Sequence, residues 1–218
     1  MRIIGGLILL LAIFSAIILL FWQQEIQYLR PTPKPQGLTQ IPLGKPVALP
    51  ALPGVQSGKP VFIHFYNPDC PCSRFNVKEF HRMVRKYSEA VQFYGIIQTD
   101  EEQARQHYKE ELGVPVILDT EGAIADRYGI YSTPQALLID EQGQLFYKGN
   151  YNKARYCTSR NTRFAELAIQ ANLDNKPLPE FHPLAYQAYG CQLPHQETET
   201  TAAFTSFQQL FNEIRTEK

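Results

Sequence analysis

Two of the four cysteines stand one residue apart, at Cys70 and Cys72, where an apolar run gives way to a helical pattern. A strand that ends in a tight turn and opens a helix places these side chains at the helix N-terminus, where unpaired N–H groups and the helix dipole favour an anion. A thiol in that place becomes a thiolate more easily. The pair therefore predicts a redox site or a soft-metal site, and the alternative is two inert structural cysteines.

Charge and composition narrow the class of protein. The 218 residues include 21 Lys and Arg and 21 Asp and Glu, so the formal net charge is zero. Nothing in this balance indicates a nucleic-acid partner, and no block of like charges forms a binding tail. The length suits one globular domain with extensions, and a chain of this size does not depend on disulfides for its core, so its cysteines indicate chemistry.

The first segment indicates a membrane anchor. Residues 3–22 carry no charge, and about 20 apolar residues at 1.5 Å each match a hydrocarbon core of about 30 Å. The segment ends in Trp22 without a small-residue cleavage site, which predicts an uncleaved single-pass anchor in the inner (cytoplasmic) membrane. Arg2 on one side and Arg30 and Lys34 on the other nearly balance. An N-terminal anchor followed by the whole soluble domain favours a periplasmic or other extracytoplasmic location.

The remaining chain divides into three parts by composition and periodicity. After the anchor (1–23), residues 24–46 are a proline-rich tether, 47–173 a globular domain, and 174–218 an extension whose helical stripe over 204–214 packs on the domain. Strands are predicted at 61–66, 91–97 and 114–118 and in a hairpin over 135–149, and helices over 72–87, 100–112, 122–128 and 162–173. This order predicts an α/β domain with a mixed sheet, since crossovers imply parallel neighbours and the hairpin an antiparallel pair.

The order of landmarks resembles the thioredoxin-like superfamily, and in particular its membrane-tethered members outside the cytoplasm. The landmarks are the strand running into Cys70, residues 130–134 before a strand, and the hairpin between Gly143 and Gly149. The resemblance covers about residues 47–173 and implies a thioredoxin-like mixed sheet flanked by helices. It also implies that the peptide bond before Pro134 is cis and that Pro134 faces the cysteines.

The cysteine motif departs from the family pattern. The family carries Cys-x-x-Cys after an aromatic residue, whereas here Cys70-Pro71-Cys72 follows Asp69, a signature that resembles an uncharacterised branch. A disulfide across one intervening residue closes a small ring and is more reducible, which favours an oxidant or an isomerisation partner. The Asp69 carboxylate disfavours thiolates, whereas Arg74 and the helix N-terminus favour them. The net direction of the shift in the thiol pKa stays open.

Two further residues are candidates for the site. His64 occupies the strand position where thioredoxins often keep a buried acid, so it is a possible proton relay; the alternative is a core histidine. Cys157 follows the hairpin and is a possible third thiol that resolves a mixed disulfide, and the alternative is a structural disulfide between Cys157 and Cys191. His81 is expected on a solvated helix face.

The leading interpretation is a membrane-anchored thiol–disulfide oxidoreductase without a cofactor, acting on protein thiols or disulfides. Cys70 would be the attacking thiolate, Cys72 the resolving thiol, and Pro134 would shape the groove for an extended substrate. The alternative from the binding class is a Cu(I) chaperone with Cys70, Cys72 and His64 as ligands. A peroxidase lacks its expected cysteine environment here, and a thioredoxin fold kept as an interaction module is the remaining possibility.

Overall fold

The computed structural model describes residues 2–24, 31–98, 104–153 and 160–193. Cys157 and the helical stripe expected over 204–214 lie outside these residues. One helix within them, α1 (Arg2–Gln24), is long and apolar enough to cross a membrane, over Ile3–Trp22, and no part of that span is buried against protein.

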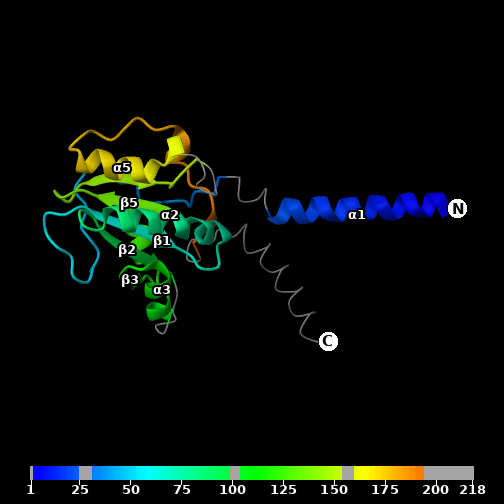
Figure 1. The fold of residues 1–218 in the computed structure, drawn as a ribbon, viewed down its shortest axis with the longest axis horizontal. Coiled ribbons are helices and arrows are strands. Elements are labelled where there is room, and N and C mark those ends of the chain that lie inside the picture. Colours follow the sequence, from blue (N-terminus) through cyan, green and yellow to red (C-terminus); the bar gives the residue numbers. More distant parts are fainter. Residues whose placement is uncertain (1, 25–30, 99–103, 154–159, 194–218) are drawn as a thin grey trace.

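A five-stranded mixed sheet forms the centre of the domain, in the order β3-β2-β1-β5-β6 (Figure 1). β1, β2 and β3 are parallel, whereas β5 is antiparallel to both β1 and β6. The strands are β1 (Val61–Tyr66), β2 (Gln92–Ile97), β3 (Val116–Leu118), β5 (Gln135–Ile139) and β6 (Leu145–Gly149). The predicted mixed sheet is confirmed, with the uninterrupted apolar run of β1 as its central strand, buried at every position.

Helices cover both faces of the sheet, and the two faces have separate cores. The helices are α2 (Pro71–Tyr87), α3 (Ala104–Leu112), α4 (Ala123–Tyr128) and α5 (Phe164–Leu173). One core joins β1 residues such as Phe62 to Phe80 of α2 and Ile169 of α5. The other joins the alternate β1 residues to Tyr128 of α4. This division follows from the two-residue period of a strand, which points Phe62 and Ile63 to opposite faces.

The proline-rich segment before β1 lies against the domain. The amide of Val47 donates to the carbonyl of Gly143 at 2.9 Å, and Pro46 pairs with Gln144 as an isolated antiparallel bridge. Farther along, the hydroxyl of Tyr128 donates to the carbonyl of Ala48 at 2.5 Å. Residues 44–47 thus lie along residues 143–145 at the start of β6, where proline is tolerated because one side of the segment needs no partner.

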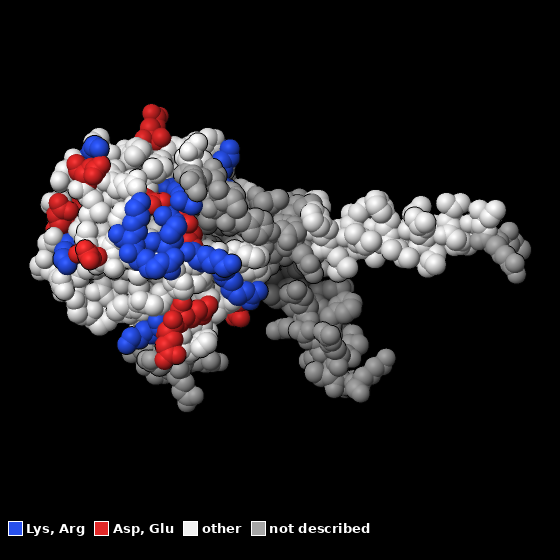
Figure 2. Space-filling model, viewed as in Figure 1, with Lys and Arg blue, Asp and Glu red and all other residues white. Residues whose placement is uncertain are grey.

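The C-terminal half of α2 is joined to α5 by ion pairs, which we call the ion-pair cluster and define as Glu79, Arg82, Arg163 and Glu166. The Arg82 guanidinium binds both carboxylates, Glu79 at 2.7 Å and Glu166. Arg163 lies 3.4 Å from Glu79, and Lys86 joins Glu166 at 3.0 Å. Figure 2 shows basic side chains gathered over this part of the surface. Because the Glu166 side chain is only 7% exposed, the pairing satisfies a charge that burial would otherwise penalise.

Candidate functional site

Cys70 stands at the junction that the sequence predicts, between β1 and α2. It is the N-cap of α2, with extended backbone angles (φ −84°, ψ 116°), and Pro71 follows at the start of the helix. The amide of Arg74 donates to the Cys70 carbonyl at 3.1 Å, which closes the first turn. Proline suits this position because a first-turn N–H has no partner within the helix. The Cys70 sulfur therefore lies at a helix N-terminus, which favours its thiolate when the sulfur is reduced.

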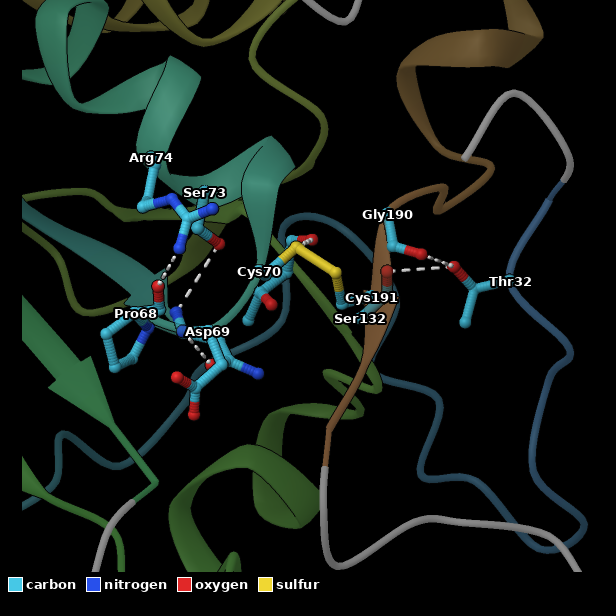
Figure 3. Close-up of a disulfide and its surroundings, with 11 residues drawn as sticks. Thr32, Pro68, Asp69, Cys70, Ser73, Arg74, Ser132, Gly190 and Cys191 are labelled. Carbon is cyan, nitrogen blue, oxygen red and sulfur yellow. Dashed lines mark hydrogen bonds between the residues drawn. A yellow bond between two sulfur atoms is a disulfide. The ribbon is translucent and has the colours of Figure 1, made fainter. Parts of the chain in front are cut away.

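The Cys70 sulfur is bonded to Cys191, with an S–S distance of 2.21 Å and Cα atoms 5.7 Å apart (Figure 3). The two residues are 121 positions apart in the sequence. The expected pairing of Cys191 with Cys157 is therefore wrong for this structure. Cys191 reaches Cys70 because it belongs to a short strand, β7 (Cys191–Gln192), that lies against the loop preceding β5.

Cys72 does not take part in this disulfide. It is 3% exposed and lies on the buried face of α2, one helical turn before Asn76 and two before Phe80. A residue two positions after the N-cap lies on a different side of the helix from the cap itself. The disulfide joins two cysteines that are distant in the sequence, and Cys72 lies outside it.

The loop before β5 completes the site from the other side. The Thr133–Pro134 peptide bond is cis, as the resemblance predicts. Thr133 belongs to β4 (Ser132–Thr133), which pairs antiparallel with β7 so that Thr133 lies opposite Cys191. The carbonyl oxygen of Thr133 is 3.5 Å from the Cys70 sulfur. Cys70, Thr133 and Cys191 thus meet at one point, although they come from three distant parts of the chain.

Two residues of the proline-rich segment, Pro31 and Thr32, pack beside β7. Pro31 pairs with Tyr189 as an isolated antiparallel bridge, and the amide of Thr32 donates to the Ala188 carbonyl at 2.9 Å. The Thr32 hydroxyl lies 2.9 Å from the Ser132 hydroxyl and donates to the Gly190 carbonyl at 3.4 Å (Figure 3). The strand that carries Cys191 is therefore held between the segment that follows α1 and the loop that precedes β5.

Gly190 permits this close approach. Its φ is +140°, in the region that favours glycine, and a Cβ built on it would lie 2.1 Å from the carbonyl oxygen of Thr133. Any side chain at this position would push β7 away from β4. Gly190, directly before Cys191, is the feature of the sequence that indicates this backbone contact.

His64 is fully buried in β1, and its surroundings keep it neutral. Its Nδ1 lies 2.7 Å from the hydroxyl of Tyr151, and its ring stacks on Phe80 with centroids 4.4 Å apart. Burial, with a smaller contribution from His81, lowers the pKa of His64 from 6.5 to about 3. The Nε2 atom has no hydrogen-bond partner among the described residues. Neutral His64 is a weak base at neutral pH, so its role as a proton relay stays a prediction.

The charged residues beside the motif are turned to solvent or to the backbone. Asp69 is exposed, and its amide donates to the side-chain oxygen of Asn67 at 2.9 Å. The Arg74 guanidinium donates to the carbonyl of Pro68 at 3.3 Å (Figure 3). Water screens the charge of an exposed carboxylate, which weakens the effect of Asp69 on the sulfur. His81, expected on a solvated face, is half-buried and lies 2.8 Å from the Glu111 carbonyl.

The expected ligands for copper are not gathered in one place in this form. Within the described ranges, no group of three or more His, Cys, Asp and Glu side chains lies close enough to hold a metal ion. Cys70 is in a disulfide and so offers no thiolate. The third-thiol role of Cys157 stays a prediction, because that residue lies outside the described residues.

Known proteins share both the fold and the sequence pattern. The chain is 30% identical over 128 residues to the thiol:disulfide interchange protein DsbE of Pseudomonas aeruginosa, covering 52% of this chain and 69% of the relative. It is 26% identical over 91 residues to the thiol–disulfide oxidoreductase ResA of Halalkalibacterium halodurans, 40% of this chain and 52% of the relative. The chain thus spans about half the length of the ResA protein it matches.

Two solved structures of uncharacterised proteins have a similar fold. A conserved protein of Geobacillus kaustophilus has a TM-score of 0.59 at 25% identity, covering 71% of this chain and 93% of that one. A hypothetical protein of Sinorhizobium meliloti has a TM-score of 0.61 at 19% identity, covering 74% and 98%. The likeness to the second protein concerns the fold alone.

The mixed sheet, the cysteine at the start of α2 and the cis proline that follows Thr133 define a thioredoxin-like protein, and its curated homologues are named thiol–disulfide oxidoreductases. The profile of one family, a domain of unknown function (DUF6436), matches residues 44–192. The chain belongs to this family. The matched range begins within the proline-rich segment and ends in β7, so it includes both Cys70 and Cys191.

Proposed function

We propose that this chain is a membrane-anchored thiol–disulfide oxidoreductase that acts on protein thiols and disulfides, with Cys70 as its reacting cysteine. The observation that carries the proposal is the position of the Cys70 sulfur, at the N-terminus of α2, in a disulfide, and 3.5 Å from the Thr133 carbonyl beside Pro134. A helix N-terminus lowers the pKa of a thiol and makes it both a better nucleophile at neutral pH and a better leaving group.

The reaction is a thiol–disulfide exchange. The thiolate of reduced Cys70 attacks one sulfur of a substrate disulfide, so that a mixed disulfide forms and the second substrate sulfur leaves as a thiolate. A second thiol of the chain then attacks the Cys70 sulfur and releases the substrate as a dithiol. Two electrons pass from the chain to the substrate, and the same steps run in reverse oxidise a substrate dithiol.

The roles of the neighbouring residues belong to the proposal. Cys72, two residues after Cys70 on the buried face of α2, is the resolving thiol that the motif suggests. Pro134 shapes the surface against which the substrate lies. Neutral His64, on the strand that leads to Cys70, would take part in proton movement only through its unpartnered Nε2.

The location is also proposed. Ile3–Trp22 anchors the chain in the inner membrane, with the domain on the extracytoplasmic side. The disulfide between Cys70 and Cys191 supports this, since such bonds persist in oxidising compartments and are rare in the cytosol.

Trapping of mixed disulfides tests the function. The full-length chain in detergent is reduced, mixed with an oxidised model protein and quenched with acid, and the products are separated on non-reducing gels. Because Cys191 also bonds to Cys70, we expect a variant with both Cys72→Ser and Cys191→Ser to accumulate a mixed disulfide that Cys70→Ser cannot form. If this double variant never forms an adduct through Cys70, and Cys70 does not exchange with glutathione, the proposal is wrong.

A further inference from the structure

We propose that Cys191 is a redox-active cysteine of the same site, and that β7 is a built-in strand that covers Cys70 until their disulfide is exchanged. The inference rests on the proposed function, because it requires Cys70 to react with thiols. It assigns to the C-terminal segment a role that the Cys70-Pro71-Cys72 motif alone does not suggest.

The cover is visible in the exposure of the two sulfur-bearing residues. Cys70 is 1% exposed, whereas Cys191 is partly exposed. β7 pairs with β4, which directly precedes Pro134. The carbonyl oxygen of Thr133 in β4 is 3.5 Å from the Cys70 sulfur. A protein substrate therefore cannot reach the Cys70 sulfur while β7 stays in place.

The contacts of β7 resemble those of an added substrate strand. Ser132 and Thr133 pair with it, and the amide of Leu193 donates to the Tyr131 carbonyl at 3.1 Å. Backbone pairing of this kind accepts any extended segment, and side chains then select among them. The place that β7 fills thus fits an extended segment that carries a cysteine, and Cys191 is the chain's own cysteine in that position.

Exposure and leaving-group chemistry together indicate where the disulfide is attacked. A thiolate of a protein dithiol attacks the partly exposed Cys191 sulfur, and Cys70 leaves as a thiolate favoured by the α2 N-terminus. The second thiol of the dithiol then attacks the first sulfur of the same dithiol, which is bonded to Cys191, and releases Cys191 as a thiolate. The dithiol loses two electrons and two protons, and Cys70 and Cys191 gain them.

Reduction of the native chain tests the role of Cys191. The full-length protein in detergent is treated with dithiothreitol as the dithiol, free thiols are alkylated at intervals, and mass spectrometry identifies them. We expect Cys70 and Cys191 to become reduced together while the domain remains folded by circular dichroism. Amide hydrogen exchange at Leu193 should then become about tenfold faster or more, because the strand is no longer covalently held.

Gly190→Ala supplies a variant that keeps every cysteine. Its Cβ would lie 2.1 Å from the Thr133 oxygen, so β7 must move outward. We expect the disulfide to be reduced about tenfold faster, since access governs exchange. Gly54→Ala is the matched control, because Gly54 also has a positive φ (+67°) but no atom within 4 Å of the added Cβ. Its reduction rate should equal that of wild type.

Two results would overturn the inference. One is a disulfide that dithiothreitol reduces only when the domain unfolds, and the other is unchanged protection of the Leu193 amide after reduction. The variant Cys191→Ser separates these failures from failure of the proposed function. If Cys70 in this variant exchanges with glutathione disulfide, the oxidoreductase stands and only the role of β7 is lost. If Cys70 is inert there too, the proposed function fails.

Discussion

The two ends of α2 are held to the domain by different chemistry. At the N-terminal end, Cys70 is bonded to Cys191 on β7. Toward the C-terminal end, Arg82 joins Glu79 to Glu166 of α5 in the ion-pair cluster. A thiol reagent reduces the disulfide and leaves the ion pairs intact. Acid protonates the carboxylates of the ion pairs and leaves the disulfide intact. The two links can therefore be broken separately, each by its own reagent.

The largest effect is expected at the disulfide. Cys191→Ser removes a crosslink between residues 121 positions apart, for which the chain-entropy model gives about 5 kcal/mol, and measured losses are typically about 2–4 kcal/mol. We expect the free energy of unfolding in urea to fall by this order without reductant. With dithiothreitol present, wild type and variant should unfold at the same urea concentration. A difference that persists under reduction would mean that the serine disturbs packing in its own right.

Glu166→Gln is expected to have the next largest effect, and it should not depend on reductant. The substitution leaves the Arg82 charge without one of its two carboxylates in a largely buried setting, which costs about 3 kcal/mol. Urea unfolding with and without dithiothreitol measures this. Asp174→Asn is the control, because Asp174 and Lys176 are 56% and 68% exposed and such pairs contribute less than about 1 kcal/mol. Equal effects of the two variants would refute the structural role of the cluster.

The ion-pair cluster should also make stability depend on pH. Burial alone would raise the pKa of Glu166, but hydrogen bonds from Arg82 and Lys86 outweigh it and lower the pKa from 4.5 to about 2. Because the folded pKa is the lower one, the stabilisation is complete above pH 4.5 and is lost as the pH falls toward 2.

Comparison of wild type with Glu166→Gln isolates this titration. Both proteins also lose stability as the pH falls from 6.5 toward 3, since buried neutral His64 has its pKa lowered over that range. The difference between the two unfolding free energies should be constant above pH 4.5 and shrink below it. A difference that does not change with pH would show that Glu166 is not stabilised as a carboxylate.

The smallest effect is expected at the outer side of β7. Thr32→Val keeps the shape of the side chain but removes its hydrogen bonds to Ser132 and Gly190, each worth about 1 kcal/mol net. We expect a loss of that order in urea unfolding and a modest increase in the rate at which dithiothreitol reduces the disulfide. An unchanged rate would show that residues 31–32 do not help to hold β7 in place.

Local patterns were sufficient for much of the fold. The apolar run of β1, the helical spacing of α2 and the antiparallel pair β5 and β6 were each predicted from residues close together in the sequence. The end of the strand and the start of the helix also predict that Cys70 lies at a helix N-terminus, which the structure confirms. These features follow from side-chain periodicity and turn chemistry, which act over a few residues.

The sequence by itself thus determined a thioredoxin-like domain with Cys70 at a helix N-terminus and an apolar segment long enough to cross a membrane. Only the tertiary structure decided which sulfur Cys70 binds, because Cys191 is 121 positions away. Three distant segments had to meet for that choice, and Gly190 had to let two backbones come into contact. A pairing of this kind leaves no periodic signal in the sequence. It depends on the packed domain, which brings β7 against β4 and places Cys191 beside Cys70.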